Sequence, residues 1–172
     1  GEIRNELGRK LELLDNDRFE FCIINDFPMY EWSEEEEKYI FMHNPFSMPK
    51  GGLEALYNPN KEDILAYQFD FVCNGVELAS GAVRNHDLNI MRKAFEIAGY
   101  KEEDIKTRFK ALYEAFQYGA PPHAGIAPGI DRMLMLLSDS DTIREVIAFP
   151  LNSKAQDLMM GAPCKVKRNL LR

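Results

Sequence analysis

Two acidic residues flank a tight turn near the middle of the chain. The segment AYQFDFVCNGVELASGAVRNH, residues 66–86, places Asn74-Gly75 between two runs of alternating apolar residues, which is a strong local pattern for a two-residue β-hairpin turn. Such a turn pairs Asp70 with Ala79 and puts Asp70 and Glu77 on one face of the sheet as diagonal neighbours. The small residues Ala79 and Gly81 then lie on that face and leave room for a flat ligand.

Two carboxylates on one half-buried face repel each other unless a cation neutralises them. Mg²⁺ is a suitable cation, because it is commonly bound by carboxylates together with phosphate oxygens. Asp70 and Glu77 therefore indicate a metal site that serves a phosphate-bearing ligand. The spacing also leaves open an exposed sheet face with two solvated acids.

One arginine follows the two acids on the second strand of the hairpin. Strict alternation puts Arg84 on the face opposite Glu77, and a β-bulge near Ser80-Gly81 would return it to the face of the acids. A guanidinium is suited to bidentate binding of a planar carboxylate. The alternative is a structural ion pair with a nearby acid such as Asp87.

A proline- and glycine-rich segment leads into an apolar helix that carries an arginine. The segment GAPPHAGIAPGIDRMLMLL covers residues 119–137, and its second half predicts a helix from Gly129 to Leu137. Backbone N–H groups at a helix N-terminus bind anions, and Arg132 adds a permanent positive charge in the first turn. The helix is apolar nearly all round, so we expect it to be buried.

The remaining patterns predict an α+β domain, an antiparallel sheet flanked by helices. Apolar periodicity predicts further helices over residues 2–14, 89–98, 102–117 and 155–160, and strands over residues 17–27, 123–127 and 145–150. In the first of these strands, Phe19, Phe21 and Ile23 share one face. Residues 31–39, EWSEEEEKY, predict a solvated turn or short helix, and residues 43–52 predict a loop.

The composition excludes several classes of protein. The 172 residues carry a net charge of −7 and are 45% hydrophobic, which is typical of a globular domain and argues against a general nucleic-acid-binding surface. Three widely spaced cysteines without a CxxC pair favour a reducing compartment over a disulfide framework or a zinc site. Because no apolar run approaches the roughly 18 residues of a membrane span, we expect no membrane association and a cytoplasmic location.

Five segments together resemble a known family. GAPPHAGIAPGIDRM resembles the third signature motif of the class II aminoacyl-tRNA synthetases. NDFPMYEW, FMHNPFSMP, GVELASGAVRNH and IREVIAFPLNSKAQDLMMGAP resemble the bacterial aspartyl members, in the order found there. The resemblance implies that residues 16–172 are the C-terminal part of a catalytic domain, with the third motif at about 119–137. Residues 1–15 resemble the end of a domain that bacterial members insert into it.

The resemblance also implies a chemistry, which depends on charge stabilisation more than on acid–base groups. These enzymes use ATP to convert L-aspartate to aspartyl-adenylate and then transfer the aspartyl group to tRNA. By implication Arg132 is the catalytic residue and clamps the γ-phosphate, Arg84 pairs with the aspartate side chain, and His43 closes over the amino acid. For His43, a histidine that caps a loop turn is the alternative. The implied set is Glu77, Gly129, Ile130, Asp131 and Arg132 for ATP, His43 and Arg84 for aspartate, and Asp70 and Glu77 for Mg²⁺.

The sequence departs from the family pattern at several positions. ASGA at residues 79–82 stands where GGGS is common, Asn44 where a second histidine is frequent, and Pro128 where phenylalanine is frequent. These departures fit a subgroup that charges tRNA-Asn as well as tRNA-Asp. The first motif, which builds the homodimer interface of the full-length enzyme, and the second motif are not found. We therefore expect the chain to be inactive by itself.

Three other interpretations are consistent with parts of the sequence. One is a related asparaginyl or lysyl enzyme, although an arginine directed at the substrate side chain favours an acidic substrate. The second is a non-catalytic synthetase-like module that keeps a nucleotide pocket. The third is a small metal-dependent hydrolase using His86 and Asp87, which is disfavoured because adjacent residues of a strand point to opposite faces.

Overall fold

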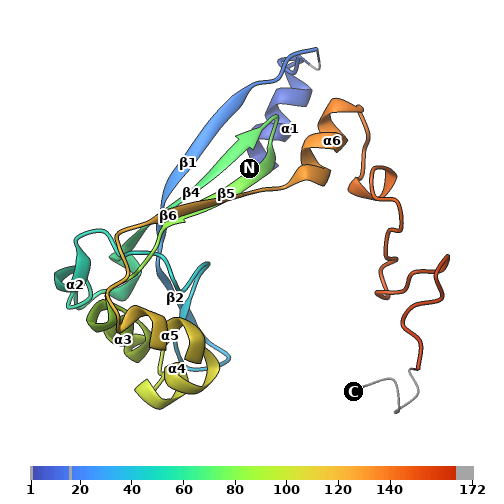
Figure 1. Cartoon of the computed structure of the whole chain (residues 1–172). Coiled ribbons are helices and arrows are strands. Elements are labelled where there is room, and N and C mark those ends of the chain that lie inside the picture. The colour runs from blue at the N-terminus through green and yellow to red at the C-terminus, as the bar shows by residue number, and fades with distance from the viewer. Residues whose placement is uncertain (1, 16, 166–172) are drawn as a thin grey trace. The chain divides into compact units, whose positions relative to one another are not determined.

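The computed structural model describes residues 2–15 and 17–165 of the chain. It forms two compact units, residues 1–128 and 129–172. Unit 1 contains a four-stranded antiparallel sheet of order β1-β4-β5-β6, with helices α2 to α5 at one end of the strands and α1 at the other (Figure 1), so the predicted α+β class is confirmed. The strands are β1 (Phe21–Pro28), β4 (Leu65–Cys73), β5 (Val76–Val83) and β6 (Ala124–Pro128). Among the described residues, no helix is long and apolar enough to cross a membrane.

The other elements of unit 1 include a second hairpin and five short helices. Strands β2 (Tyr30–Ser33) and β3 (Lys38–Phe41) pair with each other. The exposed turn predicted over residues 31–39 is therefore confined to the four glutamates at 34–37, and its flanking residues form strands. The helices are α1 (Glu2–Lys10), α2 (Gly52–Ala55), α3 (Leu88–Ile97), α4 (Glu102–Arg108) and α5 (Lys110–Phe116), with a 3₁₀ turn at Lys61–Asp63. Helix α1 ends before Leu14, so the predicted helix over residues 2–14 is too long.

The β4–β5 hairpin has the predicted two-residue turn. Asn74 and Gly75 have φ angles of +49° and +83°, the left-handed conformations that a type I′ turn requires. The Asn74 side chain also fixes the start of β1, because it accepts from the N–H of Glu20 at 2.9 Å and donates to the carbonyl of Arg18 at 2.9 Å.

The register of this hairpin shifts by one residue close to the turn. Val72 pairs with Glu77, but the next pair is Phe71 with Ala79, so Leu78 is an extra residue on β5 and forms a β-bulge. Asp70 therefore pairs with Ser80, and the predicted pairing of Asp70 with Ala79 is wrong. Periodicity cannot reveal this bulge, since both strands alternate correctly on either side of it.

The hydrophobic core of unit 1 lies between the helices and the adjoining strand ends. Tyr30 is almost completely buried, and its hydroxyl donates to the carbonyl of Ala94 at 2.9 Å. Burial raises the pKa of Tyr30, so the phenol remains a neutral donor. Two clusters make up the core: Met29, Tyr30, Leu56, Ile64, Ala66, Ala94 and Ala98, and Met91, Phe95, Ile105 and Tyr113.

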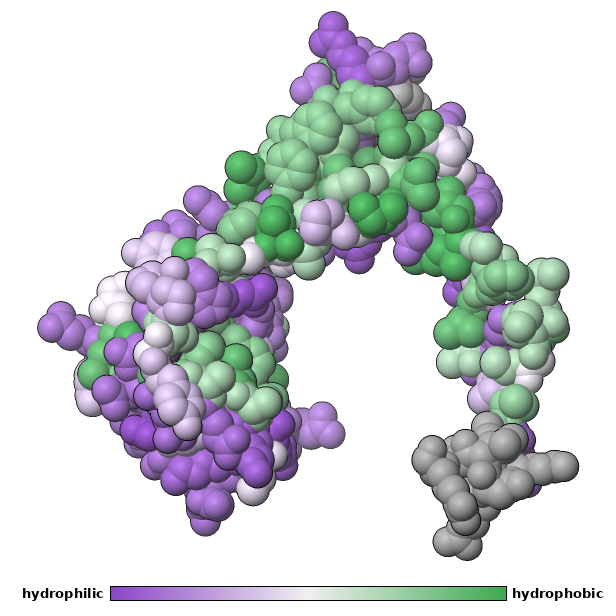
Figure 2. Space-filling view, viewed as in Figure 1, coloured by the Kyte–Doolittle hydropathy of each residue, from purple (hydrophilic) through white to green (hydrophobic). Residues whose placement is uncertain are grey.

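One face of the sheet carries apolar side chains that no other described residue covers. Phe21 and Ile23 share one face, as predicted, and are 58% and 65% exposed, and Ile126 on β6 is 52% exposed. Figure 2 shows a broad hydrophobic area over the strands. The predicted alternation is therefore correct, although the surface that would cover this face is not among the described residues.

The helix predicted over residues 102–117 is two helices. Phe109 separates α4 from α5 with φ −122° and ψ 35°. Its ring packs against Phe46 at 5.0 Å and against Phe95 at 5.7 Å, measured between ring centroids. These are tertiary contacts, which the helical periodicity of the segment cannot indicate.

A hydrogen-bonded cluster joins α3, α4 and α5. The Tyr113 hydroxyl donates to Glu102 Oε1 at 2.6 Å, and Glu102 Oε1 also lies 3.2 Å from Arg92 Nε and 3.2 Å from Lys106 Nζ. The hydrogen bond from Tyr113, followed by that from Lys106, lowers the pKa of Glu102. The ionised Glu102 is therefore favoured in the folded state.

This cluster predicts a pH-dependent contribution to stability. A lowered folded-state pKa stabilises the fold above the unfolded value, and this contribution is lost as the pH falls through the folded value. We expect Glu102→Gln to reduce the free energy of unfolding at about pH 7 and to have little effect at about pH 3. Urea unfolding at both pH values measures this. Glu103→Gln is the matched control, because Glu103 is 4.0 Å from Lys106, and equal losses at both pH values would contradict the prediction.

Over its described residues, 129–165, unit 2 contains one α-helix and little other regular structure. Helix α6 (Ile130–Leu137) begins after Gly129, as predicted, but none of its residues is buried. Ile130 is 62% exposed and Leu137 is 71% exposed, so the predicted burial is wrong for the described residues. An apolar helix requires a surface to pack against, and residues 129–165 of the unit do not provide one.

Two further predictions fail in unit 2. Residues 145–150 form no strand, and a 3₁₀ turn at Ile143–Glu145 precedes irregular chain. Residues 155–160 form no helix. The Asp157 carboxylate accepts from the N–H groups of Met159 at 2.9 Å and Met160 at 3.0 Å, which stabilises a local turn in place of a helix.

Candidate active site

The bulge at Leu78 determines which residues share a face of the sheet. Paired residues of antiparallel strands point to the same side, so Ser80 and Ala82 lie on the face of Asp70. Arg84 follows Ala82 by two residues and lies on the same side. A bulge thus brings Arg84 to the face of the acids, as the sequence required, but it lies at Leu78 and not at Ser80-Gly81.

The other face receives the residues that were expected to leave room for a ligand. Ala79 and Gly81 lie on this opposite face, so that expectation is wrong. An added Cβ at Gly81 would lie 2.4 Å from the Phe69 ring and 2.7 Å from the carbonyl oxygen of Gly125. Gly81 therefore permits close packing within the sheet, and the small residues beside the acids are Ala82 and Gly125.

The Arg84 guanidinium lies against the backbone of β6. An added Cβ at Gly125 would be 3.2 Å from Arg84 Nη2 and 3.6 Å from Nε, so the glycine provides the space that the guanidinium occupies. Arg84 is half-buried. The described residues provide its guanidinium with neither a hydrogen bond nor an ion pair. A half-buried arginine with five unpaired N–H donors is suited to a planar anion.

The alternative partner proposed for Arg84 is engaged elsewhere. Asp87 is the N-cap of α3, and its Oδ1 accepts from the N–H groups of Asn89 at 2.7 Å and Ile90 at 3.3 Å. This is the usual role of aspartate before a helix. The structural ion pair of Arg84 with Asp87 is therefore not formed.

Asp70 and Glu77 remain on one face despite the bulge. Val72 pairs with Glu77 and lies two residues from Asp70 on β4, so all three share a side. Asp70 is half-buried and has no hydrogen bond or ion pair among the described residues. No three or more metal-ligating side chains are grouped in the described part of the chain. A cation held by the two acids would need further ligands from a substrate.

His43 packs against the sheet and does not cap the loop. Its ring makes an edge contact with Phe27 at a centroid distance of 4.9 Å. The loop turn is capped by the next residue, because Asn44 Oδ1 accepts from the N–H of Phe46 at 2.9 Å. Phe27 pairs with Ala66 and therefore lies on the face of Asp70. The alternative role for His43 is excluded, since Asn44 performs it.

The loop that carries His43 is hydrogen-bonded to the strand that leads to Arg84. The N–H of Met48 donates to the carbonyl of Val83 at 2.8 Å, and the N–H of Asn85 donates to the carbonyl of Phe46 at 2.7 Å. The same loop is joined to β1 through an ion pair of 2.8 Å between Lys50 and Asp26. Residues distant in sequence thus form one connected framework around Arg84.

The remaining candidate residues lie in unit 2. Gly129 is the N-cap of α6, and Ile130, Asp131 and Arg132 form its first turn. Glycine has no side chain with which to cap the helix, and the first N–H groups of a helix have no partner within it. These groups and the exposed Arg132 are arranged at the positive end of the helix dipole.

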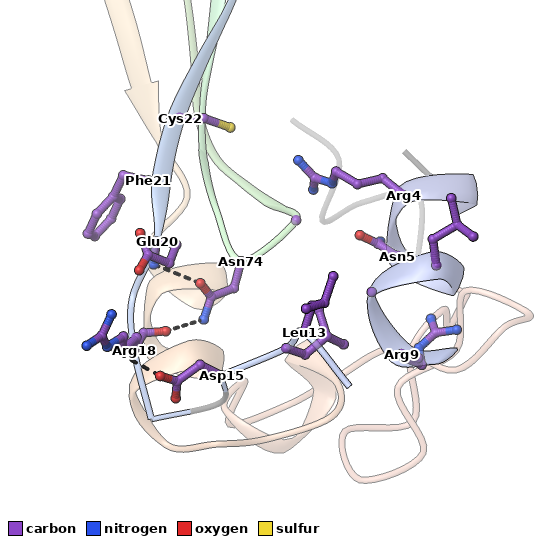
Figure 3. Close-up of a pocket in the computed structure, with 14 residues that line it drawn as sticks. Arg4, Asn5, Arg9, Leu13, Asp15, Arg18, Glu20, Phe21, Cys22 and Asn74 are labelled. Carbon is purple, nitrogen blue, oxygen red and sulfur yellow. Dashed lines mark hydrogen bonds and ion pairs between the residues drawn. The ribbon is translucent and has the colours of Figure 1, made fainter. Parts of the chain in front are cut away.

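A cavity of about 810 Å³ is present in unit 1. It is formed between α1 and the Asn74-Gly75 turn (Figure 3) and contains none of the predicted site residues. Two of its arginines are already neutralised, because Arg9 pairs with Glu6 at 2.7 Å and Arg18 pairs with Asp15 at 3.3 Å. We assign no ligand to this cavity.

Two residues that surround Arg84 were not among the predicted site residues. Gly125 provides the space for the guanidinium, and the carbonyl of His123 accepts from the N–H of Arg84 at 2.9 Å. Their only sequence signal was membership of the segment 119–137, which was interpreted for phosphate binding alone. Pairing of β6 with β5, a tertiary feature, brings this segment to Arg84.

Comparison with known proteins places the chain among tRNA synthetases. The family "tRNA synthetases class II (D, K and N)" matches residues 4–153. The "Aspartate--tRNA(Asp/Asn) ligase" of Ehrlichia chaffeensis is 57% identical over 172 residues, and that of Phenylobacterium zucineum is 58% identical over 172 residues. Both matches cover the whole chain and 29% of the relative's length.

Solved structures show the same fold at lower sequence identity. An aspartyl-tRNA synthetase from Entamoeba histolytica superimposes with a TM-score of 0.57 at 24% identity, over 88% of this chain and 26% of that one. A putative aspartyl-tRNA synthetase from Leishmania major gives a TM-score of 0.57 at 21% identity, over 80% and 22%.

Proposed function

The chain belongs to the class II tRNA synthetases (D, K and N), and on that premise we propose that it forms part of the active site of an aspartate–tRNA ligase. In this proposal, L-aspartate attacks the α-phosphate of ATP, aspartyl-adenylate forms with release of pyrophosphate, and the aspartyl group is transferred to tRNA. The observation that carries the proposal is the half-buried Arg84, whose guanidinium has no acceptor among the described residues.

Arg84 supports an acidic substrate over the alternatives within the family. A carboxylate side chain can accept two parallel hydrogen bonds from the guanidinium, whereas a lysine substrate would bring a like charge to the same place. An asparagine side chain offers only one oxygen acceptor and no charge. His43, which packs on Phe27 at the same face, would close the amino-acid side of the site.

The two acids, through a metal ion, and the first turn of α6 would bind the phosphates of ATP. Asp70 and Glu77 fit Mg²⁺, since it takes one or two carboxylates and leaves its other positions to phosphate oxygens and water. Bound there, the ion would neutralise charge on the phosphates. Gly129, Ile130 and Asp131 would present backbone N–H groups, and Arg132 would clamp the γ-phosphate. These groups act by electrostatic stabilisation, which this chemistry requires.

The names of the relatives extend the proposal to partners. Relatives named for tRNA(Asp/Asn) support tRNA-Asp and tRNA-Asn as acceptors. We further propose that the whole protein is a cytoplasmic homodimer. Residues 16–172 would be the C-terminal part of its catalytic domain, and residues 1–15 the end of an inserted domain.

A thermal-shift series on this chain tests the amino-acid preference. The ligands are non-hydrolysable aspartyl-, asparaginyl- and lysyl-adenylate analogues, each with and without Mg²⁺. A ligand at 100 times its Kd stabilises the folded state by about 2.7 kcal/mol. We expect the aspartyl analogue alone to raise the Tm, and Arg84→Lys to reduce that rise.

Other outcomes of this series would contradict specific parts of the proposal. An equal rise with all three analogues would favour a nucleotide-binding module without amino-acid selectivity. A larger rise with the lysyl or asparaginyl analogue would favour a related enzyme of the family. A cooperative unfolding transition without any shift would show that the aspartate pocket does not form in this chain.

Activity requires a full-length protein, for which a chimera is suitable. This chain would replace the aligned 172 residues of the Ehrlichia chaffeensis ligase, to which it is 57% identical. Substitutions at this chain's own residues can then be measured by ATP–pyrophosphate exchange. We refer to this protein as the chimera.

A further inference from the structure

Arg84 follows the last paired residues of β5 and β6 and forms an isolated antiparallel bridge with Ser47. The β5–β6 ladder ends with Val83 opposite Ala124, and the backbone at Arg84 is then held by single hydrogen bonds. Its N–H donates to the carbonyl of His123 at 2.9 Å, and the following N–H, of Asn85, donates to Phe46 at 2.7 Å. The backbone at Arg84 is therefore held between the segment of His123 and the loop of Ser47.

A side chain engages the carbonyl group of Arg84. His86 Nδ1 lies 3.3 Å from Arg84 O. A carbonyl oxygen only accepts hydrogen bonds, so Nδ1 must carry the hydrogen in this contact. The peptide group that follows Arg84 is thus hydrogen-bonded from both ends, through Arg84 O to His86 and through the N–H of Asn85 to Phe46. Rotation of this peptide plane would break both bonds.

The His86 ring is itself supported by neighbouring rings. Its centroid is 6.1 Å from that of His123, and His123 lies 6.1 Å from Phe116. His123 Nδ1 is 2.8 Å from the carbonyl of Pro121, which orients the second imidazole in the same way as the first. The row of rings connects the end of α5 to the backbone of Arg84.

We propose that His86 is a positioning residue for Arg84. This inference rests on the proposed function, in which Arg84 binds the carboxylate of aspartate. The described residues give the guanidinium no partner that would orient it, so its direction follows from the backbone at residue 84 and from the space above Gly125. Bidentate binding requires both N–H groups to be aligned with the carboxylate, and His86 provides this alignment by holding the Arg84 carbonyl.

Two substitutions of His86 separate the hydrogen bond from the bulk of the ring. His86→Asn places an amide N–H near the position of Nδ1 and retains a donor for Arg84 O. His86→Phe retains a ring beside His123 but has no donor. If only the bulk of the ring matters, His86→Phe should preserve the backbone at Arg84 and the KM for aspartate better than His86→Asn does. If the hydrogen bond positions Arg84, His86→Asn should preserve both better.

Hydrogen exchange in this chain tests, without any substrate, whether His86 restrains the backbone at Arg84. We expect His86→Phe to accelerate exchange of the amides of Arg84 and Asn85 by about 3- to 10-fold, the value of one hydrogen bond. His86→Asn should leave both rates within about 2-fold of the unmodified chain. Unchanged rates in His86→Phe would overturn the proposal, whatever the activity.

Kinetics of the chimera test the consequence for the substrate. We expect His86→Phe to raise the KM for aspartate by about 3- to 10-fold with the KM for ATP unchanged, and His86→Asn to restore the aspartate KM. Equal effects on both substrates, or better rescue by phenylalanine, would overturn the positioning role. If the unmodified chimera activates no aspartate, the proposed function fails, and hydrogen exchange still decides whether His86 holds Arg84.

Discussion

Replacing Arg132 by alanine in the chimera is expected to lower aspartate-dependent ATP–pyrophosphate exchange by about 100- to 1,000-fold, the cost of removing one preorganised charge-stabilising group. Arg132 lies in the first turn of α6, next to backbone N–H groups that carry the positive end of the helix dipole. The guanidinium and the dipole would stabilise the same negative charge, and alanine removes only the first. Exchange rates over a range of ATP concentrations provide the measurement.

The controls for Arg132 follow from its exposure. Arg132 is exposed in the part of the chain that the structure describes, and the Tm of Arg132→Ala, measured beside the exchange rate, separates lost activity from unfolding. Arg132→Lys keeps the charge without the planar fork and should give an intermediate rate. Near-normal exchange in Arg132→Ala would exclude Arg132 as the phosphate clamp.

Arg84→Lys in the chimera is expected to raise the KM for aspartate by about 10- to 100-fold, because a charged hydrogen bond contributes about 1.5–3 kcal/mol. Lysine keeps the positive charge but replaces the fork of N–H donors by a single ammonium group. The KM for ATP should remain unchanged, since the proposed ATP contacts come from other residues. Initial rates with each substrate varied in turn separate the two effects.

Gly125→Ala provides a matched test of the same geometry. Its new Cβ would lie 3.2 Å from Arg84 Nη2, so the guanidinium must shift although Arg84 itself is intact. We expect the same selective increase in the KM for aspartate, smaller than that of Arg84→Lys. An equal increase in the KM for ATP and the KM for aspartate in both variants would show that Arg84 supports the fold and does not bind the aspartate side chain.

In the β4–β5 hairpin, the local sequence determines the turn, whereas tertiary contacts determine the strand register. Asn74-Gly75 was sufficient to predict the turn, because few residue pairs accept two left-handed conformations. The bulge at Leu78 was not predictable in position, since a bulge is selected by the pairing of whole strands and by close contacts such as that of Gly81 with Phe69. A shift of one residue was enough to exchange the faces of Ala79 and Ser80.

The helices and residues 145–160 likewise depend on both local sequence and tertiary packing. Apolar periodicity correctly located α3 and α6, but it also predicted a strand over residues 145–150 and a helix over residues 155–160, which do not form. Periodicity reports which side of a segment is suited for packing. It does not report whether a surface is present to pack against, and the exposed α6 shows that the described residues lack one.

The sequence by itself determined the family, the α+β class and the two-residue turn, and it supplied the residue types of the proposed site. These depend on local chemistry, such as the turn preferences of Asn74-Gly75 and the guanidinium of Arg84, which are present in any conformation. Only the tertiary structure decided that Arg84 lies above Gly125, that Asp87 caps a helix instead of pairing with Arg84, and that His86 holds the Arg84 carbonyl. Such contacts arise from strand register and from the meeting of distant segments, and both are set by the packing of the whole unit.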